Sequence, residues 1–203
     1  MRLPAGPRGR AAPGPPDLDR LFGVPPAAAA LAAATGFVPS GEAGVCHRLV
    51  EGGPFGAFGR AQRDVARLLA GDGARATGLS ASPHGWGWVR VTRSPDDLDR
   101  LVADLHVVCA TLTAAGYGAY LLCSAVAFRR DGDRQRCALV HAPGRGTFYP
   151  YAPRPSGEPG TVRRDNTVET RVREALEGEL PIEPDRARWF PVPDAPGLSP
   201  PAG

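Results

Sequence analysis

Histidine and cysteine are the residues whose spacing in this sequence could support chemistry. His106 and Cys109 lie three residues apart in a segment with helical periodicity, so they would project from neighbouring positions on one helix. Such a pair could begin a metal site or a thiol–imidazole pair. Cys109 falls within an apolar stripe, however, and the spacing supplies no third ligand. We therefore interpret the pair as structural and predict no catalytic residue, no metal and no cofactor.

The other histidines have no partner that the sequence can identify. Cys46 and His47 are adjacent on a predicted strand and so point to opposite faces, which argues against joint ligation. His84 lies in a predicted turn, and His141 ends a predicted strand. An enzyme or metal protein that uses His106, Cys109 or His84 is accordingly the least favoured of three functional hypotheses.

The cysteines and the absence of catalytic motifs also argue against an enzyme. Cys46, Cys109, Cys123 and Cys137 lie in apolar segments without paired spacing, which favours reduced, buried thiols in a cytoplasmic protein. All 24 basic residues are arginine, so a phosphate-binding loop that needs lysine cannot occur. Neither a Gly-x-Ser-x-Gly elbow nor a His-Glu-x-x-His zinc helix is present. We expect a protein that is not an enzyme.

Composition excludes further classes of partner. The net charge is +3, from 24 basic and 21 acidic residues, which gives no strong attraction to nucleic acid. The use of Arg, Ala, Gly and Pro in place of Lys, Ile and Asn is typical of a GC-rich genome. No apolar run approaches the roughly 20 residues that span a bilayer. We expect no nucleic-acid binding and, at most, peripheral contact with a membrane.

The periodicity predicts an α+β domain arranged around one helix. That helix is expected over Asp96–Ala115, capped by Ser94, with Pro95 in its first turn. Its apolar stripe is Leu98, Leu101, Val102, Leu105, Val108, Cys109 and Leu112. Other helices are predicted over Ala27–Thr35, Phe55–Ala70 and Asn166–Glu177, the last with an Asn166/Glu169 capping box.

The strands are expected to form a small antiparallel sheet of about five strands, packed by the helices. Candidate strands are Gly44–Val50, Thr77–Ser82, Trp86–Thr92, Ala119–Phe128, Arg136–His141 and Thr147–Tyr151, the last three as a meander. Residues 1–17 are predicted to be a disordered Pro/Gly/Arg-rich tail, residues 18–193 a single domain, and residues 194–203 a Pro-rich tail.

Two sets of side chains are candidates for binding a partner. Trp189 and Phe190 could form an aromatic patch with Tyr149 and Tyr151, or the C-terminal segment could fold back and cover the sheet. Arg163 and Arg164, with other arginines of the last helix, could contact an acidic partner or lipid headgroups. The alternative for these arginines is a solvated surface paired with glutamates.

The chain resembles the PspAB family of PspA-associated proteins of actinobacteria. The resemblance rests on Leu21-Phe22, the Ala-rich stretch that ends at Ala-Thr-Gly-Phe37, Asp96-Asp97-Leu98, Leu101-Val102-x-Asp104-Leu105-His106, Leu121-Leu122-Cys123-Ser124, Gly146-Thr147-Phe148-Tyr149-Pro150, Arg164-Asp165-Asn166 and Ala187-Arg188-Trp189-Phe190-Pro191-Val192. It spans about Leu18 to Leu198. A Pro/Gly-rich leader and an insertion near residues 155–160 depart from the pattern.

The resemblance implies a link to the phage-shock envelope stress response, with a PspA-type coat protein or an HtpX-type membrane protease as the protein partner. The first hypothesis is therefore a cytoplasmic, non-enzymatic adaptor or regulator that acts by protein–protein binding. The second is a chaperone-like homodimer that holds an extended client on a sheet edge. The helices around a small sheet are also similar to the YbjN and type III secretion chaperone group, by analogy of fold alone.

Overall fold

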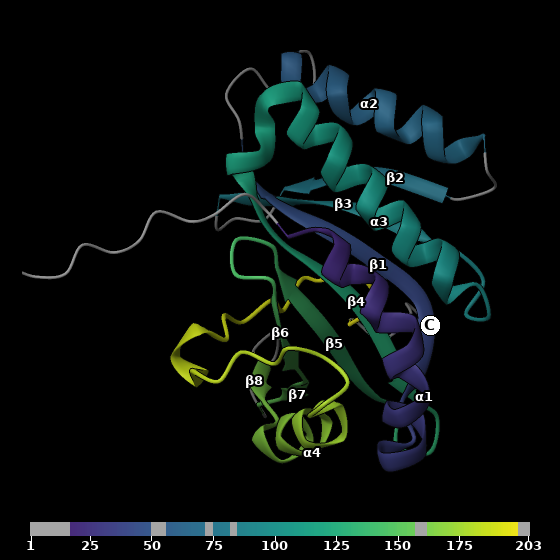
Figure 1. The fold of residues 1–203 in the computed structure, drawn as a ribbon, viewed down its shortest axis with the longest axis vertical. Coiled ribbons are helices and arrows are strands. Elements are labelled where there is room, and N and C mark those ends of the chain that lie inside the picture. The colour runs from purple at the N-terminus through teal and green to yellow at the C-terminus, as the bar shows by residue number, and fades with distance from the viewer. Residues whose placement is uncertain (1–16, 50–55, 72–74, 82–84, 157–161, 199–203) are drawn as a thin grey trace, which may run out of the picture.

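The computed structural model describes residues 17–49, 56–71, 75–81, 85–156 and 162–198. It confirms the α+β class. Four α-helices pack against an antiparallel sheet, and a second sheet of two short strands lies beside helix α4 (Figure 1). Of the tail predicted for residues 1–17, all but Asp17 lies outside the described residues, as does the turn that holds His84.

The helices and strands alternate in groups along the chain. The helices are α1 (Val24–Thr35), α2 (Ala57–Ala70), α3 (Leu98–Leu112) and α4 (Asn166–Leu176), with a 3-10 turn at Asp19–Gly23 before α1. The strands are β1 (Val38–Arg48), β2 (Arg75–Ala81), β3 (Trp86–Thr92), β4 (Leu121–Arg130), β5 (Gln135–Ala142), β6 (Thr147–Tyr151), β7 (Pro153–Pro155) and β8 (Val162–Arg164).

The main sheet has six strands in the order β2-β3-β1-β4-β5-β6, one more than expected. Strands β4, β5 and β6 form the predicted meander. Strand β1 lies between β3 and β4 and pairs with both in antiparallel fashion. The β7–β8 hairpin was missed, because three-residue strands rich in Pro and Arg carry no alternation of apolar and polar residues.

Helix α3 lies across the middle of the sheet, and its predicted apolar stripe is buried. Every stripe residue is at most 8% exposed, and Leu101, Leu105 and Leu112 are completely buried. With its continuation to Tyr120, the helix is long and apolar enough to cross a membrane by length and composition, which the sequence analysis did not anticipate. A central helix packed on a sheet has the same properties, and the burial of the stripe fits that interpretation.

The predicted boundaries of α3 are wrong at both ends. The chain turns at Pro95-Asp96, with the Asp97 amide donating to the Ser94 carbonyl at 2.9 Å, so Ser94 does not cap the helix. The first helical residue is Leu98. At the other end the helix widens into a π turn over Thr113–Tyr117, closed by Gly116 at a φ of 89°.

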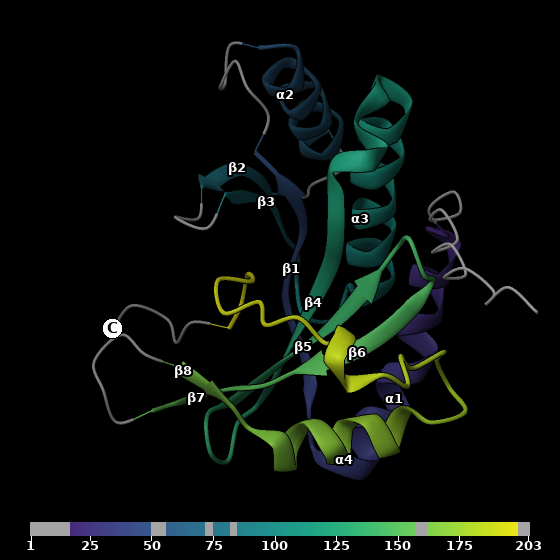
Figure 2. The same ribbon diagram turned by 90° about the vertical axis from the view of Figure 1, so that its left-hand side faces the viewer.

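The opposite face of the sheet is covered by the C-terminal segment (Figure 2). Trp189, Val192, Ala195 and Leu198 are each at most 8% exposed and pack on residues of β1, β3, β4, β5 and β6. Gly44 of β1 approaches this segment so closely that an added Cβ would lie 2.8 Å from the ring of Pro196. The packed chain therefore continues beyond the predicted boundary at residue 193.

The two edges of the main sheet differ. Along β6, the Phe148 amide donates to the Pro181 carbonyl at 2.9 Å, and the Glu183 amide donates to the Phe148 carbonyl at 2.8 Å. The segment around Ile182 thus covers the β6 edge. Strand β2 pairs only with β3 within the described ranges, so it forms the second edge.

His141 of β5 lies in the helix-facing core and is completely buried. Its ring packs on Phe148 with the centroids 4.8 Å apart, and neither ring nitrogen has a hydrogen-bond partner among the described residues. Burial lowers the pKa of His141 to about 4. The negative charge of Asp17 raises this pKa, but by less than burial lowers it. The folded state therefore requires the neutral imidazole.

Replacement of His141 by Leu, a side chain of similar volume, is expected to stabilise the fold at pH 7.5 by about 1–3 kcal/mol, because it removes buried polar atoms without partners. The folded-state pKa lies below the ordinary 6.5, so the wild-type protein should be most stable above pH 6.5 and lose about 3 kcal/mol as the pH falls towards 4. Urea unfolding at pH 7.5 and 4.5 measures both effects. His106→Gln is the control, and an equal pH dependence in wild type and His141→Leu would contradict the prediction.

Candidate functional site

An apolar groove of about 830 Å³ opens on the sheet face that carries the C-terminal segment. It lies where β1 ends, β3 and β4 begin, and β5 turns into β6. Its lining residues are Cys46, Arg48, Trp86, Gly118, Ala119, Leu121, Leu122, Cys123, Ala142, Pro143, Gly144, Arg145, Tyr149, Phe190, Pro191 and Val192. The volume is in the range of sites that hold a ligand or an anchoring side chain.

Phe190 stands at the rim of this groove. The neighbouring Trp189 and Val192 are buried, but Phe190 is 59% exposed, a value that only Leu68, at 60%, exceeds among the large apolar side chains of the described residues. Burying such a ring against a partner removes a large apolar area from water, and aromatic residues are enriched at the energetic centres of interfaces. The position of Phe190 thus makes the groove a candidate contact surface.

The charged residues of the groove are both arginines. Arg48 is exposed at the end of β1, and Arg145 lies in the β5–β6 turn. Arg145 is also paired with the buried Glu183, with 2.8 Å between Nε and Oε2. With no carboxylate in the lining, the groove suits an apolar side chain that is accompanied by an acidic group.

Three of the predicted partner-binding residues are instead part of the core. Tyr149 and Tyr151 are each 2% exposed and Trp189 is 5% exposed. The Trp189 ring stacks on Tyr149 at 6.2 Å, and its indole nitrogen donates to the Glu183 carbonyl at 2.9 Å. Of the two interpretations of the aromatic residues, folding back of the C-terminal segment over the sheet is the one observed, and it leaves Phe190 as the accessible ring.

Arg164 is a structural cross-link between four segments. Its guanidinium bonds both carboxylate oxygens of Glu169 at 2.9 and 3.0 Å and donates to the carbonyls of Pro150 and Trp189. It also lies over the Tyr151 ring at 5.2 Å. These contacts join β6, β8, α4 and the C-terminal segment. Its neighbour Arg163 is exposed on β8.

Glu169 is 1% exposed and faces inward, so the predicted capping box does not form. Asp165, one residue before the expected Asn166, caps α4 by accepting from the Val168 amide at 3.1 Å. Glu169 then lies one residue too far along to reach back to the cap. Its carboxylate accepts instead from Arg164 and from the Ala152 amide.

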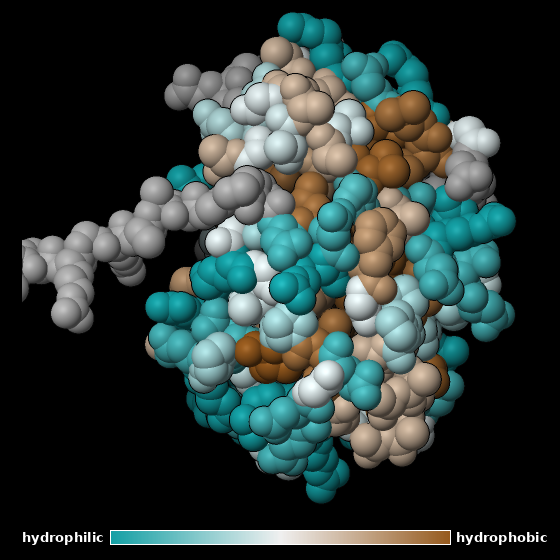
Figure 3. All heavy atoms as spheres, in the orientation of Figure 1, coloured by the Kyte–Doolittle hydropathy of each residue, from teal (hydrophilic) through white to brown (hydrophobic). Residues whose placement is uncertain are grey.

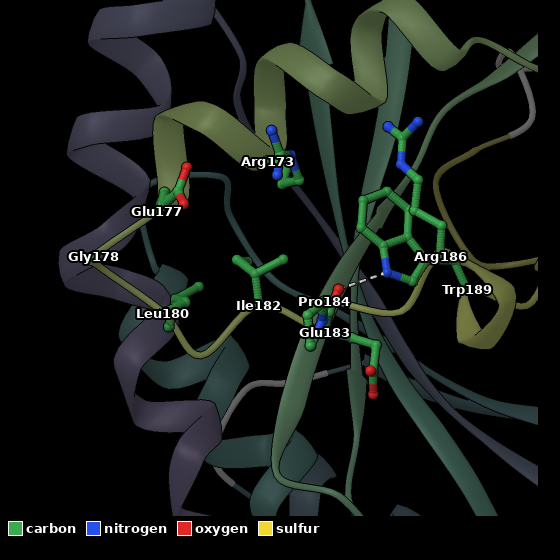
Figure 4. A pocket seen from close by; sticks show the side chains of 9 residues that line it. All are labelled: Arg173, Glu177, Gly178, Leu180, Ile182, Glu183, Pro184, Arg186 and Trp189. Atoms are coloured by element: carbon green, nitrogen blue, oxygen red, sulfur yellow. Dashed lines mark hydrogen bonds between the residues drawn. The ribbon is translucent and has the colours of Figure 1, made fainter.

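A second, smaller pocket of about 260 Å³ lies between the end of α4 and the C-terminal segment (Figure 4). Arg186 and Trp189 stand on one side of it, and Glu183, 2% exposed, approaches from below. Arg145 and Arg188 both lie within ion-pair distance of Glu183. The buried carboxylate of this pocket is thus engaged in ion pairs with Arg145 and Arg188.

Of the histidine and cysteine candidates, His106 and Cys109 are described, and they do not come together as a reactive pair. His106 pairs with Asp19 at 3.2 Å and packs on Phe22, whereas Cys109 points into the core, 3.5 Å from the Ser124 hydroxyl. Burial raises the pKa of the Cys109 thiol to about 11. Across the described ranges no group of three His, Cys, Asp or Glu residues is placed to hold a metal ion.

Most residues of the groove were not predicted from the sequence. Only Tyr149 and Phe190 of the six candidate residues line it. Trp86, Cys46 and Cys123 come from strands that are distant in the sequence, and their meeting depends on β1 lying between β3 and β4. The alternation of residues around Trp86 predicted that it lies on a strand and which side chains share its face. No local pattern predicted which strands lie beside it.

The profile of one protein family, PspA associated protein B, matches residues 2–197, nearly the whole chain. The chain belongs to this family. No curated protein and no solved structure matches the chain, so the analogy with the YbjN and type III secretion chaperone group stays a prediction. The name of this family links the chain to an association with PspA.

Proposed function

We propose that this protein is a cytoplasmic, non-enzymatic adaptor of the PspA-linked envelope stress response, and that it binds its partner protein through the groove beside Phe190. Its partner is a PspA-type coat protein or an HtpX-type membrane protease. The observation that carries the proposal is an exposed phenylalanine at the rim of an apolar groove, in a chain that belongs to a family named for its association with PspA.

The chemistry of the groove supports a protein segment as the ligand. The floor is apolar and the charged lining residues are arginines. A segment that places one apolar side chain in the groove and a carboxylate near Arg48 would complement both features. The face of the molecule that carries the helices has exposed hydrophobic side chains too, some of them in the region of α2 and α3 (Figure 3). On α2, Leu68 is 60% exposed.

Leu68 supplies a matched control for the binding test. Purified wild type, Phe190→Ser and Leu68→Ser are compared for capture of a purified PspA-type protein and of a detergent-solubilised HtpX-type protease. We expect Phe190→Ser to weaken binding at least tenfold, about 1.4 kcal/mol or more, because a central aromatic contact is lost. Leu68→Ser should bind as wild type does.

Two results would count against the proposal. Capture of neither protein by the wild type would remove the partner assignment. Binding that Phe190→Ser leaves intact and Leu68→Ser abolishes would move the contact surface to α2. Circular dichroism of both variants checks that each exposed substitution leaves the fold unchanged.

A chaperone-like homodimer is the second candidate, and the unequal sheet edges favour it. Strand β2 has an unpaired edge within the described part of the sheet, whereas the β6 edge is covered. An extended client or a second copy could pair there by strand addition. Sedimentation equilibrium tests this alternative, and a monomer at micromolar concentration would exclude the dimer.

A further inference from the structure

Two of the four cysteines lie directly opposite each other on neighbouring strands. Cys46 of β1 and Cys123 of β4 are partners in the antiparallel ladder. Opposite residues of such a ladder have Cα atoms about 4.5–5.5 Å apart, and disulfide-bonded residues have Cα atoms about 4.4–6.8 Å apart. Both thiols are free, and the backbone already holds them within the range of a disulfide.

A β-bulge lies next to this pair. The register changes between Cys46 and His47, which is opposite Leu121, so Leu122 is the extra residue of β4. Leu122 and Cys123 consequently both line the groove, opposite Cys46. Bulges recur where a strand must redirect a side chain, often beside functional sites.

The other two cysteines face away from the groove. Cys109 of α3 and Cys137 of β5 belong to the helix-facing core, whereas Cys46 and Cys123 belong to the cluster on the opposite face. The sheet therefore separates the two pairs, and Cys46 has one cysteine within reach.

The groove gives small molecules access to the pair. Cys46 is 3% exposed and Cys123 is 7% exposed, but both line a groove of about 830 Å³ that opens on the surface. A compound of a few hundred cubic ångströms can enter a space of this size without unfolding the sheet.

We propose that Cys46 and Cys123 are a dithiol that a low-molecular-weight disulfide oxidises to a cross-strand disulfide in the floor of the groove. The thiolate of one cysteine attacks the small disulfide and expels one thiolate, which leaves a mixed disulfide. The second cysteine, once deprotonated, attacks the protein sulfur of that bond and expels the other thiolate. The protein loses two hydrogen atoms, and the small disulfide is reduced to two thiols.

The reaction should be slow at neutral pH and faster in alkali. The neighbouring Cys46 thiol, as hydrogen-bond partner, and then burial raise the pKa of Cys123 well above its ordinary value. Attack requires the thiolate, so the rate rises about tenfold for each pH unit below that pKa. Once formed, the bond ties β1 to β4 beneath the groove.

The test is incubation of the reduced, folded full chain with oxidised glutathione at pH 7, 8 and 9. Mass spectrometry of the intact protein and of its peptides follows the reaction. We expect a loss of two hydrogen atoms, a Cys46–Cys123 cross-linked peptide, full reversal by a reductant, and the stated increase of rate with pH. Cys46→Ser and Cys123→Ser should each stop at a mixed disulfide with glutathione, and Cys137→Ala should behave as wild type.

Three results would overturn the proposal. The folded protein could remain fully reduced at pH 9, the cross-link could involve Cys109 or Cys137, or oxidation could require denaturant. If Cys123→Ser does not fold, Cys46→Ser alone decides between the mixed and the intramolecular disulfide. The readout is covalent, so it does not depend on whether a partner protein binds the groove.

Discussion

Arg164→Met is expected to lower the free energy of unfolding by about 3–5 kcal/mol. The substitution leaves the carboxylate of Glu169, which is 1% exposed, buried without its counter-charge. It also removes the donors to the carbonyls of Pro150 and Trp189, which anchor the C-terminal segment. Urea unfolding at pH 7.5, followed by tryptophan fluorescence, measures the change.

The adjacent Arg163→Met is the matched control for Arg164→Met. Arg163 is exposed, so its loss should change stability by no more than about 0.5 kcal/mol. Burial raises the pKa of Glu169 in the wild type, and removal of Arg164 should raise it further. The variant should therefore recover relative stability as the pH falls and Glu169 becomes neutral. Equal effects of the two substitutions would refute the structural role of Arg164.

Asp104→Ala should cost a similar amount, about 3–5 kcal/mol. Asp104 of α3 bonds Arg93, which follows β3, through two contacts of 2.5 and 2.9 Å, and the two side chains are 6% and 3% exposed. Alanine removes the Asp104 carboxylate from the buried guanidinium, together with both of these contacts. This ion pair links the end of β3 to the middle of the central helix, so thermal and urea unfolding should both shift.

Two further variants distinguish loss of the ion pair from general damage to α3. Asp99→Ala removes an exposed carboxylate from the first turn of the same helix and should cost about 0.3–1 kcal/mol. The double variant Arg93→Met with Asp104→Leu removes both charges and should recover most of the lost stability. Continued instability of the double variant would show that the packing of these positions, rather than the loss of the Asp104–Arg93 ion pair, is responsible.

The sequence was sufficient to predict the central layer of the fold. Apolar residues at intervals of three and four predict a helix that is buried on one side. All seven residues of the predicted stripe of α3 are buried. Short-range turn signals such as Asp131-Gly132 likewise gave the meander of β4 and β5. The predicted starts of α3 and α4 were wrong, because Ser94 forms a turn before α3 and Asp165, one residue before Asn166, caps α4.

The groove could not be predicted, because it depends on long-range pairing. The residues around it come from the ends of strands that pair out of sequence order, and periodicity carries no information on that order. Asp104 is a similar case. Asp104 is a charged residue among the apolar residues Leu101, Val102 and Leu105. Its burial is explained by the ion pair with Arg93, and only the folded structure brings these two residues together.

The coverage of β6 by the segment around Ile182 limits how copies of this chain could join. Within the described sheet, only β2 can accept another strand. Two copies that met there would each use the open edge of the described main sheet and produce a closed, twofold-symmetric pair. No further strand could then be added at the described edges of either main sheet, so the covered β6 edge favours a closed pair over a fibre built through this sheet.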